Sequence, residues 1–220
     1  MCLAKRCVLT NRKAAIVAKL FLVRHGETMW NRQGLYQGQS DIALSPQGAR
    51  QSERLRDRLA SEKIDAIYTS DLKRAMETAR IIAAPHNLEV VPSKELQEIG
   101  FGEFEGQRFE DIKDRFLPLE KMWRGEDLAA SAPGGESLEQ LASRLKEFVS
   151  KINHHSTQET VLIVSHGGSF RILICLLLGI GLEHWWKVRL DNAALTIIDT
   201  YEFGAIIGLL NDTCHLSGLQ

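Results

Sequence analysis

Two short apolar runs in this chain end in the same way, with a histidine followed by a glycine. Residues 20–23 lead into Arg24-His25-Gly26, and residues 161–164 lead into Ser165-His166-Gly167. Runs of branched and aromatic residues that stop at a glycine are typical of buried β-strands that break into loops. In an open α/β sheet, ligands bind just beyond the carboxyl ends of such strands. If the two strands are parallel neighbours, about 4.8 Å apart, their imidazoles face one small ligand.

The rest of the chain alternates between strand-like and helix-like patterns. We expect strands near 20–23, at 64–68 and 90–91, near 161 and at 195–200, and helices at 46–61, 72–84, 109–123 and 138–152 and from 169 through the apolar run 172–182. Ser45-Pro46 is expected to cap the helix that begins at 46, and Ser70-Asp71 the helix that begins at 72. The alternation predicts an α/β fold, a three-layer sandwich with a mainly parallel central sheet and helices on both faces.

Size, charge and cysteine content exclude several classes of protein. The 220 residues suit one domain with a substantial core. A formal net charge of −1 argues against binding to nucleic acid or to an anionic membrane, and the run 172–182 is too short to span a bilayer. The four cysteines show no C-x-x-C pairing, which favours a reducing compartment. We therefore expect a cytoplasmic protein whose partners include neither nucleic acid nor a membrane.

The N-terminal segment differs in composition from the rest. The first 19 residues contain five lysines and arginines and no acidic residue. The apolar stretch 14–18 is too short for the core of a signal peptide. We predict a disordered basic arm over residues 1–18, with a transit-type leader as the alternative, followed by a single domain over residues 19–220.

Four side chains at the predicted strand ends and helix starts would suit a phosphate dianion. Arg24, His25 and His166 follow the two strands, and Arg74 lies in the first turn of a predicted helix. A guanidinium can bind two phosphate oxygens at once, and a helix N-terminus favours an anion. Taken alone, Arg74 would be better explained as a solvated helix charge, so the prediction rests on the cluster.

A histidine beside a bound phosphate can act in two ways. In its neutral form it attacks phosphorus and forms a covalent phosphoenzyme, and in its protonated form it neutralises charge on the transferring group. An acid must also protonate the departing oxygen of an alcohol. The acidic loop at 95–106 offers Glu98, Glu103 and Glu105. The residues alone choose neither the acid nor the attacking histidine.

Metal and nucleotide chemistry find little support in the sequence. His25 and His166 could bind zinc, but no H-E-x-x-H motif and no obvious third ligand accompany them. The chain also carries no Walker-type glycine loop and no dinucleotide fingerprint. We therefore expect no metal and no cofactor.

Five motifs, in order along the chain, resemble those of the histidine phosphatase superfamily, the phosphoglycerate-mutase-like proteins. They are residues 24–28 (Arg-His-Gly-Glu-Thr) with Trp30-Asn31, residues 70–75 (Ser-Asp-Leu-Lys-Arg-Ala) with Thr78-Ala79, the loop 95–106, residues 134–137 (Gly-Gly-Glu-Ser) and residues 165–168 (Ser-His-Gly-Gly). The resemblance covers about Lys19 to His215. It implies a catalytic domain over 19–220 that needs no metal.

The resemblance also implies a role for each candidate residue. His25 would be the nucleophile that becomes phosphohistidine, Glu98 the proton donor, and His166 a third catalytic residue that contacts the phosphate. The remaining substrate-binding residues would be Arg24, Asn31, Arg74 and Gly167.

Two features are similar to the phosphatase branch of the family, which includes α-ribazole phosphatases and broad-specificity phosphatases. Only residues 107–133 lie where mutases carry a long insertion, and His166 is followed by Gly-Gly where mutases tend to have Gly-Asn. We therefore expect a metal-independent phosphomonoesterase that hydrolyses a small phosphorylated metabolite, with an α-ribazole phosphatase and a homodimer as further expectations. A 2,3-bisphosphoglycerate-dependent phosphoglycerate mutase and an inactive phospho-ligand-binding protein are the alternatives.

Residues 107–133 are predicted to form a lid-like insertion whose fold over the pocket determines the substrate. Phe116, Met122 and Trp123 in this segment either line the pocket or pack as the apolar face of a helix.

Overall fold

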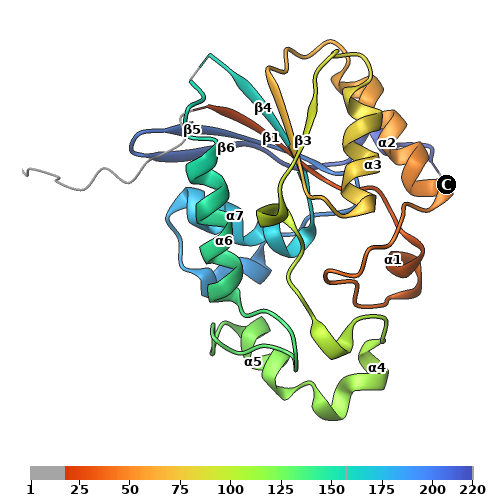
Figure 1. Cartoon of the computed structure of the whole chain (residues 1–220), viewed down its shortest axis with the longest axis vertical. Helices are drawn as coiled ribbons and strands as arrows, with labels where there is room; N and C mark the ends of the chain where they lie inside the picture. The colour runs from red at the N-terminus through yellow and green to blue at the C-terminus, as the bar shows by residue number, and fades with distance from the viewer. Residues whose placement is uncertain (1–17, 157, 220) are drawn as a thin grey trace, which may run out of the picture.

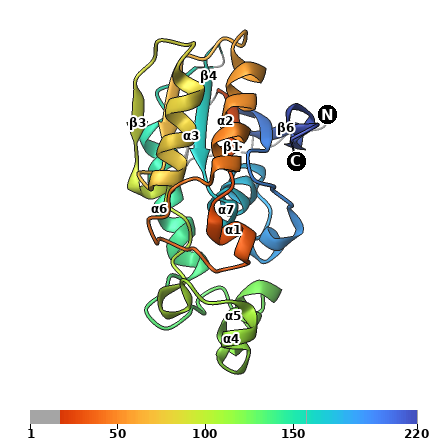
Figure 2. The ribbon, with the colours of Figure 1, turned by 90° about the vertical axis from the view of Figure 1, so that its right-hand side faces the viewer.

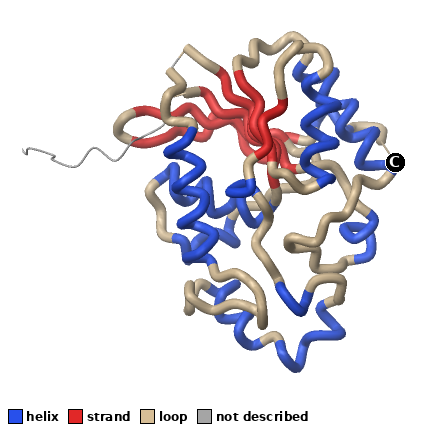
Figure 3. Tube along the Cα trace, in the orientation of Figure 1, coloured by secondary structure: helices blue, strands red, loops and turns tan. Residues whose placement is uncertain are grey.

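Six strands form one sheet in the order β3-β2-β4-β1-β5-β6, and helices cover both of its faces (Figures 1 and 3). The computed structural model describes residues 18–156 and 158–219. The strands are β1 (Lys19–Arg24), β2 (Ala66–Thr69), β3 (Val90–Pro92), β4 (Thr160–Ser165), β5 (Leu195–Tyr201) and β6 (Gly204–Asp212). Strands β1 to β4 run parallel, whereas β5 pairs antiparallel with both β1 and β6. The predicted α/β fold with a mainly parallel sheet is thus confirmed.

Alternate residues of the central strand β1 face two separate cores. Leu20 and Leu22 pack in the core that includes α6 (Leu138–Lys151) and α7 (Gly167–Leu178). Phe21 and Val23 pack in the core that includes α2 (Pro46–Leu59) and α3 (Lys73–Ala83). In Figure 1 the first helix pair lies below β5 and β6, and the second pair lies on the other side of the sheet, to the right. Because successive side chains of a strand point to opposite faces, a strand between two helix layers is apolar throughout.

The two strands that carry the His-Gly turns are parallel neighbours, which is the condition under which their imidazoles can face one ligand. Arg24 is the register partner of Ser165, and the His25 N–H donates a hydrogen bond to the Ser165 carbonyl over 3.0 Å. Both histidines therefore follow the carboxyl ends of neighbouring strands and lie at the same end of the sheet.

The predicted start of α2 is confirmed, but the predicted cap of α3 is wrong. The Ser45 side chain accepts a hydrogen bond from the Gly48 N–H over 3.0 Å. In α3 the N-cap is Leu72, which has no capping side chain. Ser70 instead accepts a bond from the Leu72 N–H before the helix begins, and Asp71 accepts one from the Gln97 side chain.

Helix α7 begins at Gly167, before the expected Ser169, and it also ends earlier than expected. At Gly179, φ is 66°, a left-handed conformation that stops the helix. Of the rest of the apolar run, only Leu182 lies in a helix, as the first residue of a 3₁₀ helix. The N-terminus of α7 therefore directly follows His166.

The segment 107–133 contains two short helices in place of the single helix expected over 109–123. They are α4 (Phe109–Ile112) and α5 (Leu117–Arg124), and Figure 2 shows both beyond the end of the sheet. A proline occupies the first turn of α5. In the first turn the missing N–H of a proline costs nothing, whereas a proline inside one continuous helix would interrupt it. The remaining helices are α1 (Met29–Gln33) and the 3₁₀ helices η1 (Lys94–Leu96), η2 (Gly102–Phe104), η3 (Lys113–Arg115), η4 (Leu182–Lys187) and η5 (Cys214–Leu216).

Strand β6 was not expected from the sequence. It forms an edge of the sheet and pairs only with β5. Its outward face carries the apolar residues Ile206 and Leu210, both exposed. The sequence of β6 therefore lacks the alternation of apolar and polar residues that indicates a half-buried strand.

The basic arm expected over residues 1–18 lies outside the described residues, apart from Ala18. Ala18 is buried, and its N–H donates to the Thr200 hydroxyl over 2.8 Å. Within the described part of the chain, no helix is both long and apolar enough to cross a membrane.

Candidate active site

A cavity of about 190 Å³ opens where β1 and β4 end. Its lining includes six of the seven candidate residues, namely Arg24, His25, Asn31, Arg74, Glu98 and Gly167. The seventh, His166, is fully buried beside the cavity, with its ring centroid 5.1 Å from that of His25. The volume is below the ~300–1,000 Å³ of pockets for drug-sized ligands, so it suits a small metabolite.

The ring of His25 has its proton on Nδ1. This nitrogen lies 2.7 Å from the Gly26 carbonyl oxygen, and a carbonyl can only accept a hydrogen bond, so Nε2 keeps its lone pair. Burial, then the positive charges of Arg74 and Arg24, hold the pKa of His25 well below its ordinary value. A neutral imidazole with a free Nε2 is a competent nucleophile at neutral pH.

The ring of His166 has the opposite tautomer. Arg74 donates from Nε to Nδ1 of His166 over 3.2 Å, so the proton of the neutral ring lies on Nε2. This buried Nε2 has no hydrogen-bond partner among the described residues. Burial, followed by the charge of Arg74, lowers the pKa of His166 well below its ordinary value. His166 thus presents a hydrogen-bond donor beside a nucleophile.

Two arginines supply positive charge to the cavity. Arg74 is fully buried, and its two terminal nitrogens donate to the carbonyls of Ser40 and Gly38, each over 2.7 Å. Burial lowers the pKa of Arg74 to about 10, which leaves it charged at neutral pH. Arg24 donates from Nη1 to the Leu190 carbonyl over 2.6 Å, while its buried Nε has no partner in the described chain. The solvated helix charge considered for Arg74 is therefore wrong.

Asn31 and Gly167 add two neutral donors. The Asn31 side-chain oxygen accepts from the Thr28 N–H over 3.0 Å and from the Asn192 amide over 3.2 Å, so its NH₂ group is turned to other acceptors. Gly167 is the first residue of α7, and its N–H is one of those that a helix leaves unbonded at its N-terminus.

Glu98 is bound to the N-terminus of α7 through backbone amides. One carboxylate oxygen accepts from the Ile99 and Ser169 N–H groups over 2.9 and 3.0 Å, and the other accepts from the Gly168 N–H over 3.0 Å. A Cβ atom on Gly168 would lie 2.5 Å from Oε1 of Glu98, so only glycine leaves room for the carboxylate.

The two other acidic candidates lie elsewhere. Glu105 accepts backbone N–H bonds from Gln39 and Phe101 and so holds loops together. Glu103 forms an exposed ion pair with Arg115. Neither side chain lines the cavity, whereas that of Glu98 does.

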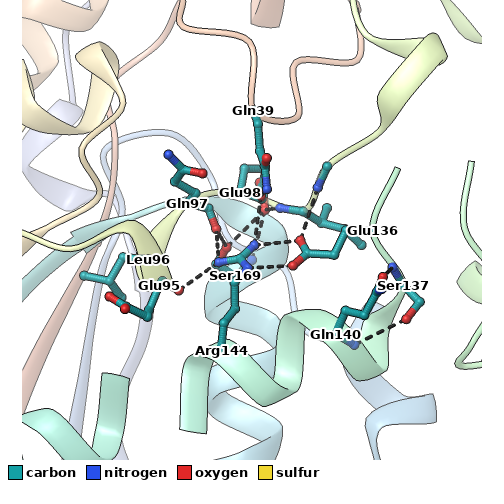
Figure 4. Close-up of polar contacts among 12 residues, drawn as sticks. Gln39, Glu95, Leu96, Gln97, Glu98, Glu136, Ser137, Gln140, Arg144 and Ser169 are labelled. Atoms are coloured by element: carbon teal, nitrogen blue, oxygen red, sulfur yellow. Dashed lines mark hydrogen bonds and ion pairs between the residues drawn. The ribbon is translucent and has the colours of Figure 1, made fainter. Parts of the chain in front are cut away.

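Arg144 of α6 holds the loop that carries Glu98 (Figure 4). Its guanidinium donates to both carboxylate oxygens of Glu136, over 2.6 and 2.8 Å. The same group donates to the carbonyls of Glu95, Gln97 and Glu98 over 2.7 to 2.9 Å. A single planar cation thus binds three backbone carbonyls of the loop and one carboxylate, a geometry that lysine could not reproduce.

Part of the cavity wall is aromatic. Tyr36, Phe101, Trp123 and Trp185 all line the cavity. Of the three residues considered in the segment 107–133, only Trp123 lines it. Met122 is fully buried in the core and Phe116 packs against that core.

Sequence patterns missed three residues of this region. Arg171 of α7 and Gln37 line the cavity, and Arg144 supports it from outside. Arg171 and Arg144 occur in helices where an arginine is ordinary, so no local signal separates them from solvated charges. Among residues 18–156 and 158–219, no three His, Cys, Asp or Glu side chains are grouped as a metal site would need.

Comparison with known proteins identifies a family model that covers most of the chain. The model described as the histidine phosphatase superfamily, branch 1, matches residues 20–213.

Curated relatives of three kinds align over nearly their whole length. Phosphoserine phosphatase 1 of Hydrogenobacter thermophilus is 38% identical, covering 91% of this chain and 95% of its own. The adenosylcobalamin/α-ribazole phosphatase of Escherichia coli is 30% identical, with 88% and 95% covered. A probable phosphoglycerate mutase, GpmB, of Yersinia enterocolitica is 35% identical, with 90% and 94% covered.

A solved structure has the same fold. It is a histidine-to-alanine mutant of the phosphoserine phosphatase of Entamoeba histolytica in complex with phosphoserine. The TM-score is 0.79 at 32% identity, with 90% of this chain and 99% of that chain covered.

Proposed function

This chain belongs to the histidine phosphatase superfamily, branch 1, whose phosphatases act on small phosphomonoesters, and from that premise we propose that it hydrolyses its substrate through a phosphohistidine on His25, without a metal. The observation that carries the proposal is the pair of opposite tautomers in the two neighbouring rings. His25 offers a lone pair at Nε2, and His166 offers an N–H at Nε2.

In the first step the phosphoryl group moves to His25. The phosphate oxygens accept hydrogen bonds from Arg24, Arg74, His166, Asn31 and the Gly167 N–H. Nε2 of His25 attacks phosphorus, and the bond from phosphorus to the ester oxygen breaks. Glu98 in its protonated form gives its proton to the departing oxygen, so that a neutral alcohol leaves.

In the second step water removes the phosphoryl group. The Glu98 carboxylate takes a proton from a water molecule, and the water oxygen attacks phosphorus. The phosphorus–nitrogen bond breaks, which releases inorganic phosphate and restores neutral His25. The arginines stabilise the charge that develops in both steps.

The direct test is to trap the intermediate. Wild-type protein mixed with a ³²P-labelled monoester and quenched in alkali should retain label that is lost in acid, as expected of a phosphoramidate. His25→Ala should retain no label and should lose nearly all turnover while keeping its circular dichroism spectrum. Normal turnover by this variant would overturn the covalent mechanism.

The control uses another histidine that does not line the cavity. His154 is exposed, and its Nδ1 donates a hydrogen bond to the Lys151 carbonyl over 3.1 Å. His154→Ala should label and turn over substrate as the wild type does. Turnover that persists in excess EDTA would support independence from a metal, and a loss that added zinc restores would contradict it.

The substrate within the class of small monoesters is a further part of the proposal. The named relatives support phosphoserine and α-ribazole 5′-phosphate as the first two compounds to assay. The helices α4 and α5 and the loops around them act in this proposal as the lid-like insertion 107–133, because Trp123 reaches the cavity from α5. The homodimer expected from the sequence remains a prediction.

A mutase activity is the second candidate, since one relative is named a probable phosphoglycerate mutase. Both activities would share the first step. They differ in whether water or a returning alcohol receives the phosphoryl group.

A further inference from the structure

The cavity has a third arginine that neither step of the proposed reaction uses. Arg171 lies on α7, one helical turn after Gly167, and lines the cavity. Its guanidinium lies over the ring of Trp185, with Cζ 5.7 Å from the ring centroid. Its Nε is buried and has no hydrogen-bond partner among the described residues. A buried donor without an acceptor is costly, so this arrangement needs an explanation.

A second unused donor lies against the same ring. The ring centroids of Trp123 and Trp185 are 4.9 Å apart. Nε1 of Trp123 is also buried and lacks a partner within the described part of the chain. An indole N–H and a guanidinium donate and never accept. Only a group that accepts hydrogen bonds could satisfy both, and an ammonium group could not.

The charges of the lining residues indicate the charge of that group. Arg24, Arg74 and Arg171 line the cavity, against the single carboxylate of Glu98. A phosphate dianion balances two of the arginines, and Glu98 is neutral when it acts as the acid. One positive charge is then left at Arg171.

The nearby acidic residue Asp191 does not pair with Arg171. Its carboxylate is bound by Arg189 over 3.0 Å and by the Asn211 amide over 2.9 Å. No ion pair of Arg171 occurs among residues 18–156 and 158–219. Arg171 is partly buried and lines the cavity, so its charge remains available to a ligand.

We propose that Arg171 and Trp123, both packed on Trp185, form a subsite for a carboxylate of the substrate, so that the protein selects phosphate monoesters of small carboxylic acids. This proposal rests on the proposed phosphatase function and deepens it. A carboxylate has a single charge and two accepting oxygens, which matches one guanidinium and one indole N–H. A second phosphate would bring two charges to a single arginine. α-Ribazole 5′-phosphate carries no carboxylate and would leave the subsite unfilled.

Two pairs of substrates that differ in the carboxylate test the proposal. One pair is phosphoserine and phosphoethanolamine, and the other is 3-phosphoglycerate and glycerol 3-phosphate. Charge-assisted hydrogen bonds of this kind correspond to a preference of about tenfold or more. We expect kcat/KM of the full-length protein to be at least about tenfold higher for the carboxylate-bearing member of each pair. Equal values within both pairs would overturn the proposal.

Variants then assign the preference to these side chains. Arg171→Gln should lower kcat/KM for phosphoserine at least about tenfold more than for phosphoethanolamine, mainly through KM. Arg171→Lys should restore part of the preference, since it restores the charge without the planar fork. Trp123→Phe keeps the ring and removes the N–H, and it should reduce the preference in the same direction. Arg54→Gln, on the exposed face of α2, is the control and should change neither value.

The remaining outcomes are also decisive. If Arg171→Gln lowers kcat/KM equally for both members of a pair, Arg171 binds the phosphate or stabilises the fold, and the proposal of a carboxylate subsite is wrong. If circular dichroism shows that Arg171→Gln is unfolded, an unchanged carboxylate preference in Trp123→Phe would overturn the proposal by itself. Turnover of p-nitrophenyl phosphate by the wild type separates the two hypotheses. Absence of turnover with this ester and with all four compounds of the two pairs would contradict the proposed phosphatase function, whereas turnover without a carboxylate preference would contradict only the subsite.

Discussion

Arg74 donates a hydrogen bond from Nε to Nδ1 of His166 over 3.2 Å, and this bond determines which nitrogen of the neutral His166 ring carries the proton. The arginine also lowers the pKa of both site histidines through its positive charge, after the larger effect of burial. The same side chain therefore favours the neutral form of both rings. The predictions below follow from this arrangement and from the contacts of Glu98.

Stability should fall at mildly acidic pH. The pKa of His166 is lowered in the folded protein, whereas in the unfolded chain it is about 6.5. Between these values the unfolded state binds the proton and the folded state does not, so the free energy of unfolding rises with pH. The contribution is fully present above about pH 6.5 and is lost as pH falls through the folded value. Urea unfolding from pH 5 to 8 measures it.

A matched pair of variants isolates this contribution. His166→Gln should flatten the rise of the free energy of unfolding with pH, whatever its absolute stability. His154→Gln, in an exposed position, should keep the wild-type slope. A wild-type slope in His166→Gln would show that the ring of His166 is not neutral in the folded protein.

The second prediction concerns the leaving group. Glu98→Gln cannot donate a proton, so turnover of an alkyl phosphate should fall by about 10²–10⁴-fold. Turnover of p-nitrophenyl phosphate should fall far less, because its phenolate departs with little help. Steady-state kinetics with both substrates gives the ratio. Glu103→Gln, whose exposed carboxylate pairs with Arg115, should leave the ratio unchanged; a change there would move the acid role to that residue.

The third prediction uses the space beside Glu98. In Gly168→Ala the new Cβ would approach Oε1 of Glu98 to 2.5 Å and displace the carboxylate. We expect slower turnover of alkyl phosphates, again with a smaller effect on p-nitrophenyl phosphate. The control is Gly208→Ala in β6, where a Cβ meets no atom closer than 3.7 Å. Similar kinetics for Gly168→Ala and Gly208→Ala would mean that turnover does not require the position of the Glu98 carboxylate at the N-terminus of α7.

The fourth prediction concerns the support of the acid loop. Arg144→Ala leaves the carboxylate of Glu136 and three carbonyls without their donor, and it should cost on the order of 3 kcal/mol of stability. Arg144→Lys should also raise the ratio of p-nitrophenyl phosphate to alkyl phosphate turnover, because it loosens the backbone at Glu98. Arg124→Ala removes an exposed i,i+4 pair with Glu120 and should cost at most about 0.5 kcal/mol. If urea unfolding gave equal losses of stability for Arg144→Ala and Arg124→Ala, this prediction would be contradicted.

The fifth prediction separates phosphatase from mutase. A mutase must exclude water until the phosphoryl group returns to an alcohol, and the two short helices α4 and α5 offer little material for such closure. Incubation with 3-phosphoglycerate should therefore release inorganic phosphate without forming 2-phosphoglycerate. Rapid interconversion of the two, dependent on a trace of 2,3-bisphosphoglycerate, would make the protein an isomerase.

The sequence by itself determined the features that depend on near neighbours in the chain. The apolar runs before His25 and His166 predicted two buried strands, since a strand between helix layers is apolar on both faces. Ser45-Pro46 predicted the start of α2 because capping is a local interaction. The order of the five motifs indicated the family. These inferences needed no knowledge of which distant residues meet.

The tertiary structure decided everything that depends on contacts between distant segments. The proton positions on His25 and His166 follow from a backbone carbonyl in one case and from an arginine 92 residues away in the other. Unlike Glu103 and Glu105, Glu98 reaches the amides of α7 and lines the cavity, and no pattern of carboxylates in one loop encodes that. Arg171 and Trp123 meet on Trp185 because separate elements fold against one ring. Sequence patterns predict how a segment folds, but burial and hydrogen-bond partners are set only when the segments pack together.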